Sequence, residues 1–112
     1  MVCPYISRSA INIGKTLEDT GALTFVDAVQ FAPHHLVDVK ELGYDFLAFS
    51  SYKFFRPHLG IVWGRLALLN SLFPYKQRCV SDANPNRYAM GTPQYEVLVG
   101  LSATVRYFEE IG

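Results

Sequence analysis

The sequence has no excess charge of either sign, because ten Lys and Arg residues balance ten Asp and Glu residues. Proteins that bind nucleic acid or anionic lipid through charge carry clusters or an excess of basic residues. The zero net charge therefore gives this chain no electrostatic reason to seek either partner, and we expect neither nucleic acid nor membrane among its ligands.

Cysteine and long apolar runs are also scarce. The two cysteines, Cys3 and Cys79, are too few for a disulfide framework and too far apart for a close pair of metal ligands. We interpret them as ordinary thiols of a reducing compartment. The sequence shows no charged leader with an apolar core, and no apolar run is long enough to span a membrane. These absences predict a soluble, cytoplasmic protein.

What is present is a globular composition, with 50% hydrophobic and 14% aromatic residues in a chain of 112. This length suits one domain, residues 1–112. Apolar runs without polar alternation are typical of strands covered on both faces, as in parallel sheets. Such runs predict strands at residues 22–26, 45–49 and 60–64, with short helices at 38–42 and 66–72. Strands that alternate with helices predict the α/β class.

Local signals predict where the helices begin and end. Asp38 is the expected N-cap of the first helix, and Gly43 is expected to end it. A longer helix is predicted near the end of the chain, with Thr92 as its N-cap and Pro93 at its first position. Its apolar stripe has helical spacing and comprises Leu98, Leu101, Val105 and Phe108.

Two ionisable residues follow the predicted strands, Asp27 after the first and Lys53 shortly after the second. In open α/β sheets, ligands bind outside the carboxyl ends of the strands. A buried acid and a lysine at such an edge have three interpretations: a structural ion pair, a general acid–base pair, or a cofactor site. The residue types alone do not decide between them.

A metal site is not predicted. His34 and His35 are adjacent, and adjacent side chains point in different directions in most backbones. No third ligand lies at a familiar spacing from them. His34 is interpreted as part of a loop.

The surrounding motifs resemble the cofactor-lysine region of class V aminotransferases, and within that superfamily the cysteine desulfurase-like branch. The resemblance runs from about Ser9 to Gly112, and it depends on the order and spacing of several segments rather than on any one of them. These segments are Val26–Gln30, Ala32–His34, Val37–Val39, Asp45–Phe46, Ser50–Phe55, Pro57–Ile61, Met90–Pro93 and Gly100–Leu101.

The resemblance implies the three-layer large domain of a fold-type I enzyme that uses pyridoxal 5'-phosphate. Lys53 would be the Schiff-base lysine, which holds the cofactor aldehyde and later moves a proton at the substrate carbon. Asp27 would pair with the pyridine nitrogen and keep the ring cationic. Gln30 would donate a hydrogen bond to the phenolic oxygen of the cofactor. The implied substrate is an amino acid, and the implied chemistry is carbon–sulfur cleavage or transamination.

Three further residues are implied in phosphate binding. Ser50 would donate to the phosphate, together with Tyr52, which stands where relatives often have histidine and can also donate. Thr92 corresponds to a residue that reaches the phosphate of the neighbouring subunit. The resemblance therefore implies a homodimer.

The sequence also departs from the family pattern. Arg56 stands where relatives usually have glycine, and we expect it to weaken cofactor binding if that position needs a positive φ. Ala89 replaces a glutamate that usually precedes the Gly-Thr-Pro motif. The length predicts an internal piece of such an enzyme, without the N-terminal part of the large domain and without the C-terminal small domain. We therefore do not expect turnover by this chain alone. The alternative interpretation is a non-catalytic, truncated remnant that self-associates or binds a full-length homologue.

Overall fold

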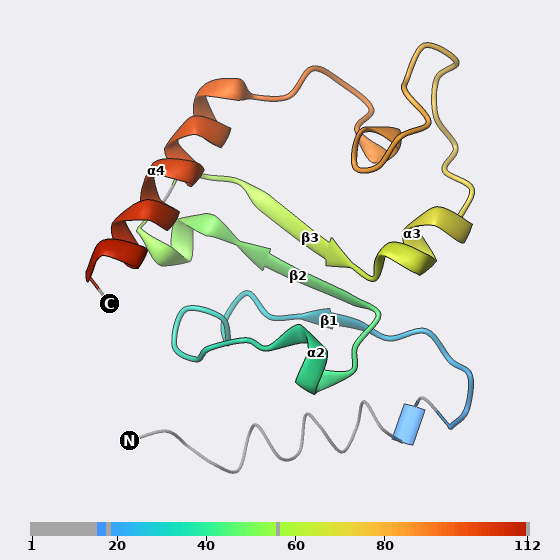
Figure 1. The fold of residues 1–112 in the computed structure, drawn as a ribbon, viewed down its shortest axis with the longest axis horizontal. Coiled ribbons are helices and arrows are strands. Elements are labelled where there is room, and N and C mark those ends of the chain that lie inside the picture. Colours follow the sequence, from blue (N-terminus) through green and yellow to red (C-terminus); the bar gives the residue numbers. More distant parts are fainter. Residues whose placement is uncertain (1–15, 18, 56, 112) are drawn as a thin grey trace.

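The computed structural model describes residues 16–17, 19–55 and 57–111. These residues form a three-stranded sheet of β1 (Phe25–Asp27), β2 (Phe46–Ser50) and β3 (Gly60–Gly64), in that order (Figure 1). β1 pairs with β2 in parallel, and β2 pairs with β3 antiparallel. The three strands lie close to the predicted positions, although β1 begins later than expected.

The register assigns side chains to two faces of the sheet. Val26 pairs with Leu47, and Leu47 pairs with Trp63, so these apolar side chains share one face. We call it the covered face, because residues 28–39 and α2 (Val39–Leu42) pack over it. Asp27, Ala48 and Val62 share the other face, which we call the open face.

The predicted caps of α2 are confirmed. Asp38 Oδ1 accepts hydrogen bonds from the N–H groups of Lys40 and Glu41, at 2.9 and 3.2 Å. Gly43 follows the helix with a φ of 69°, a left-handed conformation that glycine adopts without steric cost. Both signals are local, which is why the sequence predicts this short helix correctly.

A polar cluster joins the beginnings of β1 and β2 to the end of β3. The Thr24 hydroxyl donates to Asp45 Oδ2 at 3.0 Å and accepts from the Asp45 N–H at 2.9 Å. The Thr24 N–H also donates to Asp45 Oδ2, at 2.8 Å. Arg65 Nε lies 3.6 Å from Asp45 Oδ1 and donates to the Tyr44 carbonyl at 3.1 Å. The cluster fixes the end of the sheet that lies opposite the carboxyl ends of β1 and β2.

The chain then passes through α3 (Leu66–Ser71) and a long irregular segment that includes a short 3₁₀ helix, η2 (Asn86–Tyr88). The last helix, α4, spans Tyr95–Ile111 and lies near the carboxyl end of β2 (Figure 1). Its predicted start is wrong. The Leu98 N–H donates to the Gln94 carbonyl at 3.1 Å, so helical bonding begins two residues after Thr92, which lies outside the helix with Pro93. Local capping preference is weak compared with tertiary packing.

The buried apolar core of the described residues is small and consists of Ala28, Tyr44 and Leu47. Burial raises the pKa of the Tyr44 hydroxyl. The expectation that β1 is covered on both faces is wrong, because Phe25 is 64% exposed even though its ring stacks on Phe46 with 6.1 Å between centroids. No described helix is long and apolar enough to cross a membrane.

Candidate functional site

Sheet register brings two of the predicted site residues together. Asp27 is the last residue of β1 and pairs with Ala48 of β2. Ser50 is the last residue of β2 and lies two positions after Ala48, so Asp27 and Ser50 occupy neighbouring positions on the open face. Because β1 and β2 are parallel, both residues lie at the edge where ligands bind in α/β sheets.

The backbone beyond β1 fixes the Asp27 carboxylate. Its Oδ1 accepts from the Val29 N–H at 2.9 Å, while the Ala28 N–H donates to the Ala48 carbonyl at 2.8 Å. Gln30 lies in the turn that follows, three residues after Asp27, and its side chain is exposed. The turn therefore keeps Asp27 and Gln30 at the same edge of the sheet.

Lys53 follows β2 directly. It lies in a 3₁₀ helix, η1 (Ser51–Phe54), with Ser50 at the N-cap position. The Lys53 ammonium nitrogen lies 5.0 Å from the centre of the Tyr52 ring, within the range of a cation–π contact. The other partner of Tyr52 is His58, whose ring stacks on it with 5.1 Å between centroids and an interplanar angle of 18°. The Tyr52 ring thus joins Lys53 to the segment that precedes β3.

The hydroxyls of the two neighbouring serines have different surroundings. Ser51 is 1% exposed, and its hydroxyl donates to the Pro57 carbonyl at 2.6 Å and lies 3.2 Å from the Leu59 carbonyl. Ser50 makes no side-chain capping bond to η1. Of the two serines, Ser51 therefore has its hydroxyl engaged by backbone carbonyls, whereas Ser50 makes no such capping bond.

Exposure differs from what the sequence predicts. Asp27 and Lys53 are both exposed, so the expectation of a buried acid is wrong. The physical reason is that no described element covers the open face beside Asp27. The Asp27 carboxylate and the Lys53 ammonium form no ion pair in the described part of the chain. A carboxylate and an amine that bind different atoms of one ligand cannot be paired with each other, and Asp27 and Lys53 are not.

Thr92 is not brought to this edge. The exposed segment that contains it leads into α4 and lies beyond β3, away from the carboxyl end of β1 (Figure 1). The implied role of Thr92 concerns the phosphate of a neighbouring subunit, which one chain does not test. Arg56 lies outside the described residues. The non-glycine residue with positive φ in the described part of this segment is Phe55, at 62°.

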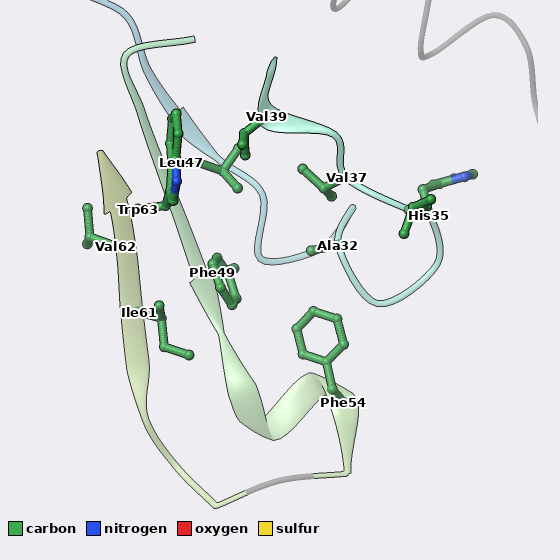
Figure 2. A pocket seen from close by; sticks show the side chains of 11 residues that line it. Ala32, His35, Val37, Val39, Leu47, Phe49, Phe54, Ile61, Val62 and Trp63 are labelled. Atoms are coloured by element: carbon green, nitrogen blue, oxygen red, sulfur yellow. The ribbon is translucent and has the colours of Figure 1, made fainter. Parts of the chain in front are cut away.

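The covered face holds an apolar cavity of about 460 Å³. Figure 2 shows Phe49 of β2 and Ile61 of β3 on one side of it, with Ala32 and Val37 on the other and Phe54 of η1 nearby. Asp27, Ser50 and Lys53 do not line this cavity. Its lining is apolar apart from His35, and it lies on the other face of the sheet from Asp27 and Ser50.

No metal centre is found among the described residues, where no group of three or more His, Cys, Asp or Glu side chains could hold an ion. The His35 ring instead stacks on Phe31, with 4.5 Å between centroids. Cys79 is a free, exposed thiol.

Sequence reasoning missed the structural role of Ser51 and the stacking of Tyr52 on His58. A serine followed by a proline six residues later gives no recognised signal for a long-range bond between side chain and backbone. The stacking partner also lies across a turn whose shape depends on the left-handed Phe55. Local patterns do not specify either contact.

Comparison with known proteins places these features in a family. Residues 8–112 match the family Aminotransferase class-V. A probable cysteine desulfurase from Mycobacterium leprae is 36% identical over 107 residues, which cover 85% of this chain and 26% of the relative. An aminotransferase-like protein from Gibberella zeae is 36% identical over 118 residues, which cover 98% of this chain and 29% of that protein.

Solved structures agree with the sequence matches. The apo structure of the cysteine desulfurase from Thermococcus onnurineus NA1 superposes with a TM-score of 0.78 at 34% identity, and covers 92% of this chain and 29% of that one. A cysteine desulfurase from Escherichia coli gives a TM-score of 0.73 at 28% identity. The chain thus spans between a quarter and a third of the length of these proteins.

Proposed function

The chain belongs to the class-V aminotransferase family and has the α/β fold of fold-type I cysteine desulfurases, and from this premise we propose that it binds pyridoxal phosphate at the carboxyl ends of β1 and β2. One observation carries the proposal: parallel pairing sets Asp27 opposite Ala48 on the open face, Ser50 lies two positions further along the same face, and Lys53 follows on the next turn. When bound, the cofactor supplies an aldehyde for an amine and a ring that accepts electrons.

The residues present fit this cofactor in chemical type. Asp27 has one carboxylate oxygen fixed by the Val29 N–H, which leaves the other to accept from a protonated pyridine nitrogen. The Ser50 hydroxyl and the Tyr52 phenol can donate to phosphate oxygens, and Gln30 can donate to a phenolic oxygen. Gly60, opposite Ser50, leaves room on this face, since an added Cβ would meet no atom within 4 Å.

Lys53 is the proposed carrier of the cofactor and the residue that moves a proton at the substrate carbon. Its amine must be neutral to react, and a neutral amine is favoured where water is excluded. The Lys53 side chain is exposed, so the described residues do not exclude water from it. The geometry therefore supports cofactor binding by these residues rather than turnover by them alone.

The proposed substrate is an amino acid, and the proposed reaction class is carbon–sulfur cleavage or transamination. The matched cysteine desulfurases support carbon–sulfur cleavage, and the matched aminotransferase-like protein supports transamination. Two assays on the chain with bound cofactor distinguish the reactions. Release of sulfide from cysteine indicates carbon–sulfur cleavage, and formation of a keto acid from alanine indicates transamination. The homodimer implied through Thr92 is part of the same proposal.

A titration with pyridoxal phosphate, followed by borohydride reduction and mapping of the labelled lysines, tests the site. We expect saturable labelling of Lys53 that is absent in Lys53→Arg and unchanged in the matched control Lys40→Arg. Asp27→Asn keeps an oxygen for the Val29 N–H but removes the charge, and should weaken binding by about tenfold, the lower end for a bond to a charged group. Labelling spread evenly over the lysines would contradict the proposed site.

A second candidate function is non-catalytic association with another copy or with a full-length homologue. The observation that favours it is the amount of exposed apolar surface beside a small core. Leu36, Phe55 and Tyr75 are each more than 90% exposed, and Val99 on α4 is 68% exposed. Exposed apolar patches mark interaction surfaces. Sedimentation of the purified chain distinguishes the two: a compact monomer that labels at Lys53 would exclude association as the function.

A further inference from the structure

We propose that Ser51 is a positioning residue for Lys53: its buried hydroxyl ties the turn that carries the lysine to the segment entering β3. This inference rests on the proposed function, because it concerns where the Lys53 amine is held for the cofactor. Ser51 itself touches neither the amine nor the open face, so it acts through the backbone.

The first support is the burial and bonding of the Ser51 side chain. Among the described residues it is the one fully buried side chain, at 1% exposure. A hydroxyl has one proton to donate, and the 2.6 Å distance to the Pro57 carbonyl identifies the main acceptor. The Leu59 carbonyl lies 3.2 Å from the same oxygen and accepts from the Ser51 N–H at 2.9 Å. The residue is thus anchored through both its backbone and its side chain.

The second support is the position of these bonds along the chain. They close a short loop that begins at Ser51, two residues before Lys53, and ends at Pro57 and Leu59. Inside the loop, Phe55 adopts a φ of 62° although its aromatic side chain is 93% exposed. A bulky residue is strained in this conformation, and the exposed Phe55 side chain makes little packing contact that would offset the strain. The Ser51 bonds close this loop from the buried side, and the stacking of Tyr52 on His58 joins its two ends at the surface.

The third support is that the far end of the loop is itself held by another element. An added Cβ at Gly100 of α4 would lie 3.5 Å from Pro57 Cγ, which shows that the helix backbone runs beside the proline. Leu101 of α4 lines a small cavity of about 100 Å³ together with Ser51 and Phe54. Ser51 therefore connects the lysine turn to a segment that α4 supports.

The test compares two variants of Ser51 with a matched serine elsewhere. Ser51→Ala removes the hydroxyl, and Ser51→Cys keeps the side-chain volume while replacing a strong donor with a weak one. Ser71→Ala is the control, because the exposed Ser71 hydroxyl also donates to a backbone carbonyl, that of Leu68 at 2.9 Å, on α3. All variants are studied where circular dichroism shows the folded chain, and labelling is expressed per folded molecule.

We expect Ser51→Ala and Ser51→Cys each to lower the preference for labelling Lys53 over Lys40 and Lys76 by about fivefold, the factor for one typical hydrogen bond. Before reduction, the Schiff-base absorbance of the complex should shift toward that of pyridoxal phosphate with free lysine. Ser71→Ala should match the unmodified chain in both measurements. Ser51 variants that lose stability but keep the same preference per folded molecule would overturn the positioning role.

Hydrogen exchange separates this inference from the proposed function. If the unmodified chain labels its lysines evenly, the cofactor proposal fails. The role of Ser51 in holding the turn is then tested by the hydrogen exchange of the Tyr52–Phe55 and His58–Gly60 amides. Faster exchange there in Ser51→Ala, with Ser71→Ala unchanged, supports Ser51 as the anchor of the Lys53 turn. Unchanged exchange overturns it, whatever the labelling shows.

Discussion

Replacing Thr24 with valine should destabilise the fold by about 2 kcal/mol, although the two side chains have nearly the same shape. Thr24 is 6% exposed, and its hydroxyl both donates to Asp45 Oδ2 and accepts from the Asp45 N–H, at 3.0 and 2.9 Å. A bond to a charged acceptor contributes ~1.5 kcal/mol or more, and leaving a partly buried N–H without a partner costs at least ~1 kcal/mol. Burial of the added methyl group contributes ~0.8 kcal/mol and offsets part of this loss.

Urea unfolding followed by circular dichroism measures this loss. With a slope of ~1–2 kcal/mol/M for a chain of this size, the midpoint should fall by about 1–2 M at an unchanged slope. Thr20→Val is the matched control, because the Thr20 hydroxyl donates to the Leu17 carbonyl at 2.7 Å in an exposed turn; its effect should stay within ~0.5 kcal/mol. A Thr24→Val midpoint equal to that of the control would refute the importance of this cluster.

Two further predictions concern exposed positions. Phe55→Gly should raise stability by roughly 0.5–1 kcal/mol in the same urea assay, because relief of a left-handed conformation (~1–2 kcal/mol) exceeds the entropic cost of glycine. Phe55→Ala keeps the Cβ and should show no such gain. Equal urea midpoints for the two variants would contradict the strain at Phe55. The hydrogen bond from Lys76 lowers the pKa of the Asp82 carboxyl below its ordinary 3.8. A lowered folded pKa adds stability that is present above pH 3.8 and is lost as the pH falls through the folded value. The free energy of unfolding, measured at a series of pH values from neutral to 2, should therefore fall less steeply in acid for Asp82→Asn than for the unmodified chain. The same dependence on pH in both chains would count against the Lys76 contact.

Sequence alone predicted the elements whose signals are local. The caps of α2, Asp38 and Gly43, follow from side-chain hydrogen bonding and from the left-handed conformation of glycine. β3 was predicted at residues 60–64, and the structure has it at Gly60–Gly64. The α/β class follows from the alternation of such elements, and the match of residues 8–112 to the class-V aminotransferases confirms the family resemblance.

Predictions that depended on distant partners were less accurate. The apolar run before Asp27 indicated a strand with both faces covered, yet only one face of β1 has a described partner layer, and Phe25 remains exposed. The antiparallel direction of β3 has no signal within its own residues, because pairing is decided by the turn between η1 and β3. The helix predicted from Thr92 instead begins beyond Pro93, at Tyr95, and its contact with Pro57 lies further along, at Gly100.

The candidate site combines two kinds of support that should respond differently to mutation. Asp27 and Ser50 are placed by backbone pairing between parallel strands, which no single side chain provides. Lys53 is placed by a short turn that one buried hydroxyl ties down. Surface substitutions elsewhere should therefore leave the carboxylate and the phosphate donor where they are, whereas a change at Ser51 or Phe55 moves the amine alone. A lower preference for labelling Lys53, with an intact sheet, is the result that this division of support requires.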